Sequence, residues 1–532
     1  MLRVAVRPTD QADHLFPRTL TACFPLLWSR VLFPGAGAEP TRPRLLTLAI
    51  LVLLPGVLLY PRMGFHLLEP DEGRYAEIPR EMLARGHWIV PHLDGQPYLD
   101  KPPLLYWLVM LSYSVLGINE AAARLAPALA VHITILAVYL IGRRSLGERA
   151  AGWGALLLAM APGFTCVGRL LILDGLLACC TTIAILSAFE AIRCDRLKWG
   201  WWLLAALMTG LGILTKGPIA LILLAPPIWL FRRLQSEHCE IGWKHVGAFT
   251  ALLMMVNLPW FVAVGVRAPE FLWHFFWKHN IQRFMQPFDH LRPVWFYVPV
   301  LLAGLLPGTL LLVGFLRFLF SGQTQQARVK SPALGFMLLA GLWCILFFSL
   351  SGSKLPTYIV PAFPLLALAL GVYVAQRWPN RPTIPAFLAG TAFAGLAALH
   401  LAFIPWYAQQ RSPLGEPAEV LRYCANTEQT VICFPRSCDS VSFYLKRDDI
   451  RTARSKNSLE LISLLHEQPR TVVLFTHRHS LEALRCSLPH DLQIVEVITF
   501  KRDKENGLLF DLVTTETPWG LCDLAVVERV GG

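Results

Sequence analysis

One polar stretch, residues 69–103, combines side chains that could do chemistry at the edge of a membrane. Its ionisable and phenolic residues of interest are Asp71, Glu72, Arg74, Tyr75, Asp100 and Lys101. An apolar run, residues 45–60, comes directly before it. Carboxylates beside a hydrophobic wall are costly and usually have a function. Here they could act as a base or stabilise developing positive charge, so the stretch is the first candidate for an active site.

A second group of polar side chains recurs between later apolar runs. Its members are Asp174, Lys216, His279, Arg283, Lys354 and Tyr358. Each has an ordinary structural alternative: a lysine can extend its ammonium to the membrane surface, an aspartate can cap the next helix, and a histidine can anchor at the interface. Together, several cations and a few carboxylates on one membrane surface favour a site for a lipid phosphate, because Arg and Lys bind phosphate oxygens.

The composition of the chain indicates a membrane protein. Of its 532 residues, 55% are hydrophobic and only 16% are charged, and the mean hydropathy is +0.48. Soluble domains carry about 25% charged residues, so the long apolar runs are predicted to be membrane helices. The net charge of +12 comes from short basic clusters between these runs, which is typical of cytoplasmic loops. The sequence shows no basic face of a folded domain, and nucleic acid is therefore not expected as a partner.

The apolar runs predict a mainly α-helical, polytopic transmembrane bundle of about 11–13 helices. Eleven of them are expected to cross the bilayer: 45–60, 121–141, 151–167, 171–192, 201–214, 219–231, 246–266, 294–316, 332–350, 358–375 and 384–406. Residues 104–116 are short for a span and are predicted to lie at the interface. With this odd number, residues 1–44 lie in the cytoplasm, the loop 62–103 lies outside, and every basic cluster falls on the cytoplasmic side.

Residues 409–532 carry more charge than the apolar body and show a different pattern. Short β-rich runs occur at 431–434, 471–475, 494–500 and 508–513, with helical patterns at 458–466 and 481–486. They predict a small α/β domain on the extracytoplasmic side. A Cys433–Cys438 disulfide would fit an oxidising compartment, although five thiols that are free or paired unpredictably are the preferred interpretation. The expected plan is thus a cytoplasmic segment 1–44, a transmembrane domain 45–408 and an outer domain 409–532.

Five motifs occur in an order that resembles the bacterial aminoarabinose (lipid A) transferases, which belong with the protein O-mannosyltransferases to the GT-C glycosyltransferases. The motifs are Glu69-Pro-Asp-Glu-Gly-Arg-Tyr-Ala-Glu-Ile, Tyr98-Leu-Asp-Lys-Pro-Pro-Leu-Leu-Tyr-Trp, Ala-Ala-Ala-Arg124-Leu-Ala-Pro, Leu214-Thr-Lys-Gly-Pro and Ser353-Lys-Leu-Pro-Thr-Tyr. The resemblance extends from about residue 45 to residue 406. It does not cover residues 1–44 or the C-terminal domain.

The resemblance implies an enzyme of the bacterial inner membrane that takes a sugar from a polyprenyl-phosphate donor on the periplasmic side and transfers it with inversion. It implies that Asp71 faces the reacting centre and that Asp174 is a second acidic residue nearby. It also implies that Lys101, Arg283 and Tyr358 hold the donor phosphate. We group the further residues by expected role: Lys216 and Lys354 are additional phosphate-binding candidates, and Glu72, Arg74 and Tyr75 are supporting residues.

A divalent metal is the one cofactor that the resemblance suggests. The family commonly has a glutamate before Lys-Pro-Pro, and this sequence has Asp100 there. Together with His279, Asp100 is the predicted metal-binding pair.

Three activities fit these residues. The acceptor of the sugar could be lipid A or another envelope glycolipid, or it could be a protein hydroxyl. A hydroxyl must lose a proton and would need a base, whereas a lipid A phosphate is already anionic. A lipid-linked sugar transporter or flippase without chemistry is the third activity. Transporters often place Gly- or Pro-broken helices in matching halves, and the breaks at Lys216-Gly-Pro and Ser351-Gly-Ser have no matching partner.

The topology predicts that position 95 is outside and position 196 is in the cytoplasm. In a cysteine-depleted background, Gly95→Cys should react with a membrane-impermeant maleimide added to intact spheroplasts, and Arg196→Cys should react only after lysis. Labelling of position 95 only from the cytoplasmic side would contradict the topology.

Overall fold

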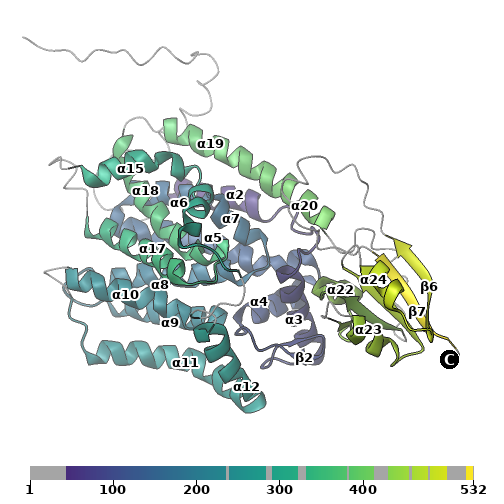
Figure 1. Cartoon of the computed structure of the whole chain (residues 1–532). Coiled ribbons are helices and arrows are strands. Elements are labelled where there is room, and N and C mark those ends of the chain that lie inside the picture. Colours follow the sequence, from purple (N-terminus) through teal and green to yellow (C-terminus); the bar gives the residue numbers. More distant parts are fainter. Residues whose placement is uncertain are drawn as a thin grey trace, which may run out of the picture.

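The computed structural model describes residues 44–234, 239–282, 285, 290–321, 331–379, 383–411, 424, 429–453, 458–476, 480–499 and 523–530. Figure 1 shows a large helical body and, at its edge, a small sheet domain formed by the C-terminal part of the chain. The expected cytoplasmic segment 1–44, apart from its last residue, and the expected strand 508–513 lie outside the described residues. The boundaries expected between the domains stay predictions.

The helical body is built from helices that follow the apolar runs. They are α2 (Leu45–Leu59), α4 (Leu104–Leu116), α5 (Glu120–Leu146), α6 (Glu148–Ala159), α7 (Pro162–Arg169), α8 (Leu173–Ile192), α9 (Trp199–Lys216), α10 (Ile219–Leu234), α11 (Trp243–Arg267), α12 (Glu270–Leu272), α14 (Tyr297–Gly304), α15 (Leu312–Phe320), α17 (Pro332–Leu350), α18 (Phe363–Arg377), α19 (Thr383–Ala398) and α20 (Ile404–Arg411). Short 3-10 or π segments join them: η1 (Trp273–Gln282), η2 (Val294–Phe296), η3 (Gly308–Leu311), η4 (Pro356–Ala362) and η5 (Leu399–Phe403). The prediction of a mainly helical, polytopic membrane protein is confirmed.

Within the described residues, six helices are long and apolar enough to cross a membrane, and the number is eight if each of two bent pairs forms one span. One bent pair is α6 with α7, at 59°, and the other is Val294–Gly304 with Gly308–Phe320, at 100°. Prolines lie at both breaks, Pro162 and Pro307, where the missing N–H interrupts the helical hydrogen bonds. The count of eleven spans stays a prediction.

The centre of the helical body is α8, which packs against α5 and α9. Within the apolar segment of α8, 94% of the residues are buried. Beside it, α6 and α18 approach each other closely. A Cβ added at Gly371 of α18 would lie only 2.3 Å from the carbonyl oxygen of Ala150 in α6. Small residues allow such contact between membrane helices. In contrast, only 17% of the residues in the apolar segment of α11 are buried. The outer face of this helix is therefore available to lipid.

The segment expected to form an outer loop at residues 62–103 contains at its centre a helix that the sequence did not predict. This helix is α3 (Asp71–Arg85), which ends at Gly86 in the left-handed conformation. A short hairpin of β1 (His92–Leu93) and β2 (Gln96–Pro97) follows. Acidic residues in the first turn of α3 suit the positive end of the helix dipole. Apolar side chains recur on its buried face at helical spacing: Tyr75, Ile78 and Met82.

A buried ion pair fixes α3 to the helical body. Arg124 of α5 is fully buried and donates to both carboxylate oxygens of Glu72 at 2.8 Å. The same carboxylate accepts from the backbone N–H groups of Leu171 at 2.7 Å and Leu68 at 2.9 Å. The guanidinium also donates to three carbonyl oxygens, those of Met63, Phe65 and His66. Because both charges are paired and further hydrogen-bonded, they can be buried in their ionised forms.

A second buried arginine, Arg169 at the end of α7, holds the segment that leaves α2. Its guanidinium donates to four carbonyl oxygens, those of Leu58, Leu59, Pro61 and Arg62. The ring of Phe65 lies 3.6 Å from the guanidinium carbon of Arg124 and 5.6 Å from that of Arg169. Two cations therefore fix the connection between α2 and α3, which has no regular secondary structure.

The C-terminal domain is a five-stranded sheet in the order β4-β3-β5-β7-β6. Its strands are β3 (Thr430–Phe434), β4 (Arg451–Thr452), β5 (Arg470–Phe475), β6 (Leu492–Thr499) and β7 (Asp523–Arg529), and its helices are α22 (Asp439–Leu445), α23 (Ser458–Leu465) and α24 (Ser480–Ser487). β3 is parallel to β4 and β5, whereas β7 is antiparallel to β5 and β6. The small α/β domain is thus confirmed. Cys433 and Cys438 are free, so the disulfide considered between them is not formed.

The buried pair should dominate the stability of the α3 region. Arg124→Met leaves the Glu72 carboxylate buried without its counter-ion, and loss of one partner of a buried pair costs about 3–5 kcal/mol. The melting temperature of the purified protein in detergent should fall clearly. Arg470→Met, which removes an exposed pair with Glu528, should change stability by less than about 1 kcal/mol. A wild-type melting temperature in Arg124→Met would contradict this role.

Candidate active site

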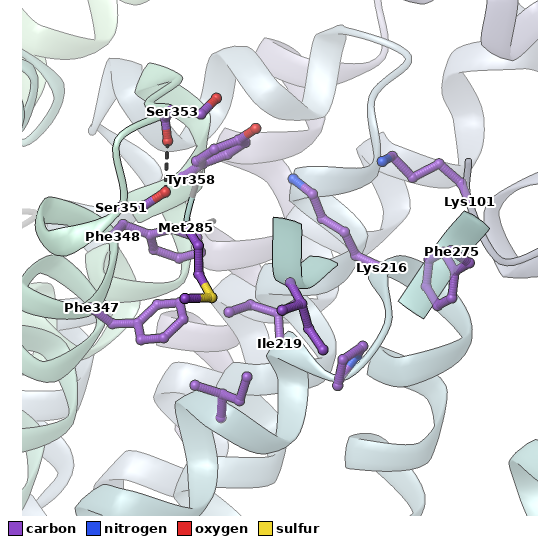
Figure 2. A pocket seen from close by; sticks show the side chains of 13 residues that line it. Lys101, Lys216, Ile219, Phe275, Met285, Phe347, Phe348, Ser351, Ser353 and Tyr358 are labelled. Carbon is purple, nitrogen blue, oxygen red and sulfur yellow. Dashed lines mark hydrogen bonds between the residues drawn. The ribbon is translucent and has the colours of Figure 1, made fainter. Parts of the chain in front are cut away.

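A cavity of about 500 Å³ opens in the helical body between the ends of α9 and α17, η1 and η4. Its walls are mostly apolar, and the residues that line it are Lys101, Lys216, Pro218, Ile219, Ile222, Phe275, Ile281, Met285, Phe347, Phe348, Ser351, Ser353 and Tyr358. Figure 2 shows the ammonium groups of Lys101 and Lys216 and the ring of Tyr358 turned toward one region of this space. An apolar cavity with cations at one end suits an amphiphile with an anionic head group.

Lys216, the last residue of α9, is held by two neighbours. Its ammonium donates to Oδ1 of Asp174 at 2.7 Å and lies 4.6 Å from the ring centroid of Tyr358. Asp174 is in the first turn of α8 and is only 7% exposed. The structure therefore brings together three predicted site residues from three different elements. The carboxylate of Asp174 orients the ammonium group of Lys216 at the cavity.

Lys354, a predicted phosphate-binding residue, has other partners. It is 3% exposed, and its ammonium donates to the carbonyl oxygens of Ser351 and, at 3.1 Å, Arg292. Its backbone N–H donates to the carbonyl of His290 at 3.0 Å. Burial lowers the pKa of Lys354. These contacts connect the loop after α17 to the segment before η2. Lys354 thus holds in place the loop that contributes Ser351 and Ser353 to the cavity wall.

Asp71 is exposed at the first position of α3, and among the described residues it does not line the cavity. Glu72 points the other way, into the buried pair with Arg124. Of these two neighbouring carboxylates, that of Asp71 is therefore the exposed one.

The other two predicted supporting residues of α3, beside Glu72, have clear contacts. Arg74 donates through Nε to Oδ2 of Asp439 at 3.2 Å, and its guanidinium carbon lies 6.0 Å from the ring centroid of Tyr98. Tyr75 is buried, with its ring centroid 6.3 Å from that of Tyr106. Both side chains thus hold α3 in place, and Arg74 does so through the C-terminal domain.

The predicted metal pair of Asp100 and His279 stays a prediction, because one of its two side chains is not among those described. Asp100 lies 3.1 Å from Nε2 of His274. The side chain of His279 and the whole of Arg283 lie outside the described residues. The described part of the chain contains no group of three or more His, Cys, Asp or Glu residues that could hold a metal ion.

Sequence reasoning missed several residues that shape the site. His274 was not distinguished from the other histidines of its loop, and Arg124 was noticed only as part of a motif. The apolar walls were also missed, although Phe347 and Phe348 come just before Ser351-Gly-Ser. Bulky aromatic residues beside a polar break in a membrane helix are the signal that could have indicated a cavity wall.

Comparisons with known proteins found relatives in sequence and in fold. Residues 100–260 match the family model described as dolichyl-phosphate-mannose-protein mannosyltransferase. An undecaprenyl phosphate-α-4-amino-4-deoxy-L-arabinose arabinosyl transferase of Edwardsiella ictaluri is 36% identical over 376 residues, which cover 68% of this chain and 65% of the relative. The Pseudomonas aeruginosa transferase is 34% identical over 384 residues, covering 70% and 68%. Matches to other relatives, from Pseudomonas fluorescens and Serratia proteamaculans, cover only 56% and 57% of their length.

Two solved structures share the fold. ArnT from Cupriavidus metallidurans in the apo state has a TM-score of 0.71 at 21% identity, covering 91% of this chain and 97% of that one. The same protein bound to undecaprenyl phosphate has a TM-score of 0.69 at 20% identity, covering 92% and 98%. The chain therefore has the fold of this membrane protein. By sequence, it belongs to the family of the undecaprenyl phosphate-aminoarabinose arabinosyl transferases.

The cavity geometry predicts that Lys101 contributes to binding a lipid phosphate. Lys101→Ala removes one charge-assisted contact, worth about 1.5–3 kcal/mol, so the dissociation constant for undecaprenyl phosphate should rise roughly 10- to 100-fold. Lys244→Ala, at an exposed position of α11, is the matched control and should bind like the wild type. The measurement is the binding of labelled undecaprenyl phosphate to purified protein in detergent. Equal affinity in Lys101→Ala and the control would remove Lys101 from the site.

Proposed function

We propose that this protein transfers 4-amino-4-deoxy-L-arabinose from an undecaprenyl-phosphate donor to lipid A, with inversion at the anomeric carbon. The observation that carries the proposal is the apolar cavity whose polar region holds Lys101, Lys216 and Tyr358, in a chain of this family. The isoprenyl chain would lie against the apolar wall. The donor phosphate would lie at the ammonium groups.

The first chemical requirement is a stabilised leaving group. The bond between the anomeric carbon and the phosphate oxygen breaks, and the undecaprenyl phosphate leaves with the bonding electrons. Negative charge grows on the phosphate as the bond breaks, and fixed cations stabilise it in a site that excludes water. Lys101 and Lys216 supply these cations, and Asp174 holds Lys216 in position through its 2.7 Å hydrogen bond.

The second requirement is a carboxylate near the anomeric carbon, where positive charge gathers as the phosphate departs. Asp71 is the candidate, because it is exposed at the start of α3 while Glu72 is committed to Arg124. A lipid A phosphate is already anionic and attacks without losing a proton. Asp71 therefore stabilises charge and orients the acceptor, and it has no proton to remove.

The site and the C-terminal domain are proposed to face the periplasm. Two helices that begin beside the site, α5 and α10, end at Arg143-Arg144 and at Arg232-Arg233. Positive charge marks the cytoplasmic ends of membrane helices, so the opposite ends of both helices would lie on the periplasmic side. A lipid A acceptor is reachable from that side.

Transfer of a sugar to a protein hydroxyl is the second candidate, because residues 100–260 match the protein mannosyltransferase model. Mass spectrometry of lipid A and of periplasmic proteins, from cells with and without the gene, separates the two. The proposal predicts lipid A that gains a 4-amino-4-deoxy-pentose only when the gene is present. A gene-dependent hexose on periplasmic proteins with unchanged lipid A would replace it with the second candidate.

Asp71→Asn tests the role of the carboxylate. A general base contributes about 10²–10⁴-fold. With a phosphate acceptor the loss of turnover should be measurable but smaller, and the acidic limb of the pH profile should follow the acceptor phosphate. Asp195→Asn, exposed after α8, is the matched control. Wild-type turnover in Asp71→Asn would exclude Asp71 from the site, and loss of the acidic limb would assign it as a base.

A further inference from the structure

The first turn of α3 is in direct contact with the C-terminal domain. Arg74 forms an ion pair with Asp439 at 3.2 Å, and the backbone N–H of Ser440 donates to Oε1 of Glu69 at 2.6 Å. Asp439 and Ser440 are 2% and 0% exposed. Asp71 lies between Glu69 and Arg74 in the sequence, so the contacts flank the candidate catalytic carboxylate. Figure 1 shows α3 and α22 side by side at this junction.

The backbones of α3 and α22 approach each other as closely as a glycine allows. A Cβ added at Gly73 would lie 2.4 Å from Oε1 of Glu69 and 2.6 Å from the backbone nitrogen of Ser440. Real Cβ atoms essentially never come this near to other atoms. Any larger residue at position 73 must therefore push α22 away from the first turn of α3.

Further along, α22 is anchored in the helical body by its side chains. Phe443 is 4% exposed and belongs to the same buried cluster as Tyr75 and Tyr113. The hydroxyl of Tyr444 accepts a hydrogen bond from the backbone N–H of Leu67 at 2.9 Å. In addition, Ser442 donates to Asp94 at 2.7 Å, which connects α22 to the hairpin after α3. The junction is therefore a packed interface rather than a single contact.

Burial and the neighbouring carboxylate of Asp439 raise the pKa of Glu69 above its usual range. A neutral Glu69 does not repel the adjacent buried carboxylate of Asp439, and this favours the ion pair of Asp439 with Arg74.

We propose that the C-terminal domain positions α3, and with it Asp71, for sugar transfer, and that Asp439 and Ser440 are positioning residues that act through Arg74 and Glu69. The body holds the other side of the same turn through the pair of Glu72 with Arg124. This inference rests on the proposed function, because it assigns Asp71 to the reaction. A displacement of about 1 Å can cost an enzyme 100-fold in rate, so loosening one side of the turn should slow the chemical step.

The test is steady-state kinetics of the full chain in proteoliposomes, with the undecaprenyl-phosphate aminoarabinose donor and lipid A. Asp439→Asn should lower kcat about 10-fold, while the KM for the donor stays within roughly twofold, because the cations of the cavity are on other elements. The conservative Asp439→Glu, which keeps the charge, should recover most of kcat. Gly73→Ala should lower kcat in the same way, since it forces α22 away from α3.

Matched controls separate this effect from a general loss of the domain. Asp491→Asn breaks an exposed contact with His466 elsewhere in the C-terminal domain and should leave kcat unchanged. Gly64→Ala places a methyl group where nothing lies within 4 Å and should also be neutral. Melting temperatures identify any variant that fails to fold.

Hydrogen exchange of the backbone amides of α3 provides a readout that needs no activity. Asp439→Asn should make residues 71–85 exchange faster while β3 and β5 stay protected. A normal kcat in Asp439→Asn and Gly73→Ala, unchanged exchange of α3, or a rise in donor KM equal to the fall in kcat would each overturn the proposal. If the wild-type protein transfers no sugar, the proposed function fails, and the exchange experiment still decides whether the C-terminal domain orders α3.

Discussion

The buried pair of Arg124 with Glu72 is the interaction on which the arrangement of the site depends. The apolar side chains of α3 lie on its buried face, but its first turn is acidic and needs a specific attachment to the membrane bundle. Arg124 provides it and also donates to the carbonyl oxygens of Met63, Phe65 and His66. Arg169 likewise donates to the carbonyl oxygens of Leu58, Leu59, Pro61 and Arg62. The path from α2 to α3 is therefore fixed. Asp71 takes its position from Glu72, the next residue in the chain.

The candidate site consists of two parts carried by different elements. Lys216, Asp174 and Tyr358 bring a cation to an apolar cavity from α9, α8 and η4. The carboxylate of Asp71 comes from α3, which is held between the helical body and α22. In a glycosyl phosphate the phosphate and the anomeric carbon are one oxygen apart. The two parts must therefore be placed accurately relative to each other, and preorganised charges of this kind are a main source of catalytic power.

Features that depend on local sequence could be predicted, whereas features that depend on contacts between distant parts of the chain could not. Local signals predicted the apolar helices, most strands of the outer domain, and Lys101, Lys216 and Tyr358 as site residues. The helical state of α3 was not predicted, because its buried Glu72 depends on Arg124, which is distant in the sequence and is brought beside it only by the fold. Asp174 was predicted to be a second acidic residue near the reacting centre. Its contact with Lys216 was not predicted, because it depends on how α8 packs against α9. The carbonyl groups that bind Lys354 could not be predicted either, because the fold brings them together.

The most direct test of the account is transfer by the purified full chain in proteoliposomes, followed with an isotope-labelled sugar on undecaprenyl phosphate. The account predicts that the label moves to a phosphate of lipid A with inverted anomeric configuration, and that Lys101→Ala requires more donor to reach the same rate. A protein that binds the donor but leaves the label on it, or moves the intact donor across the bilayer, would contradict it.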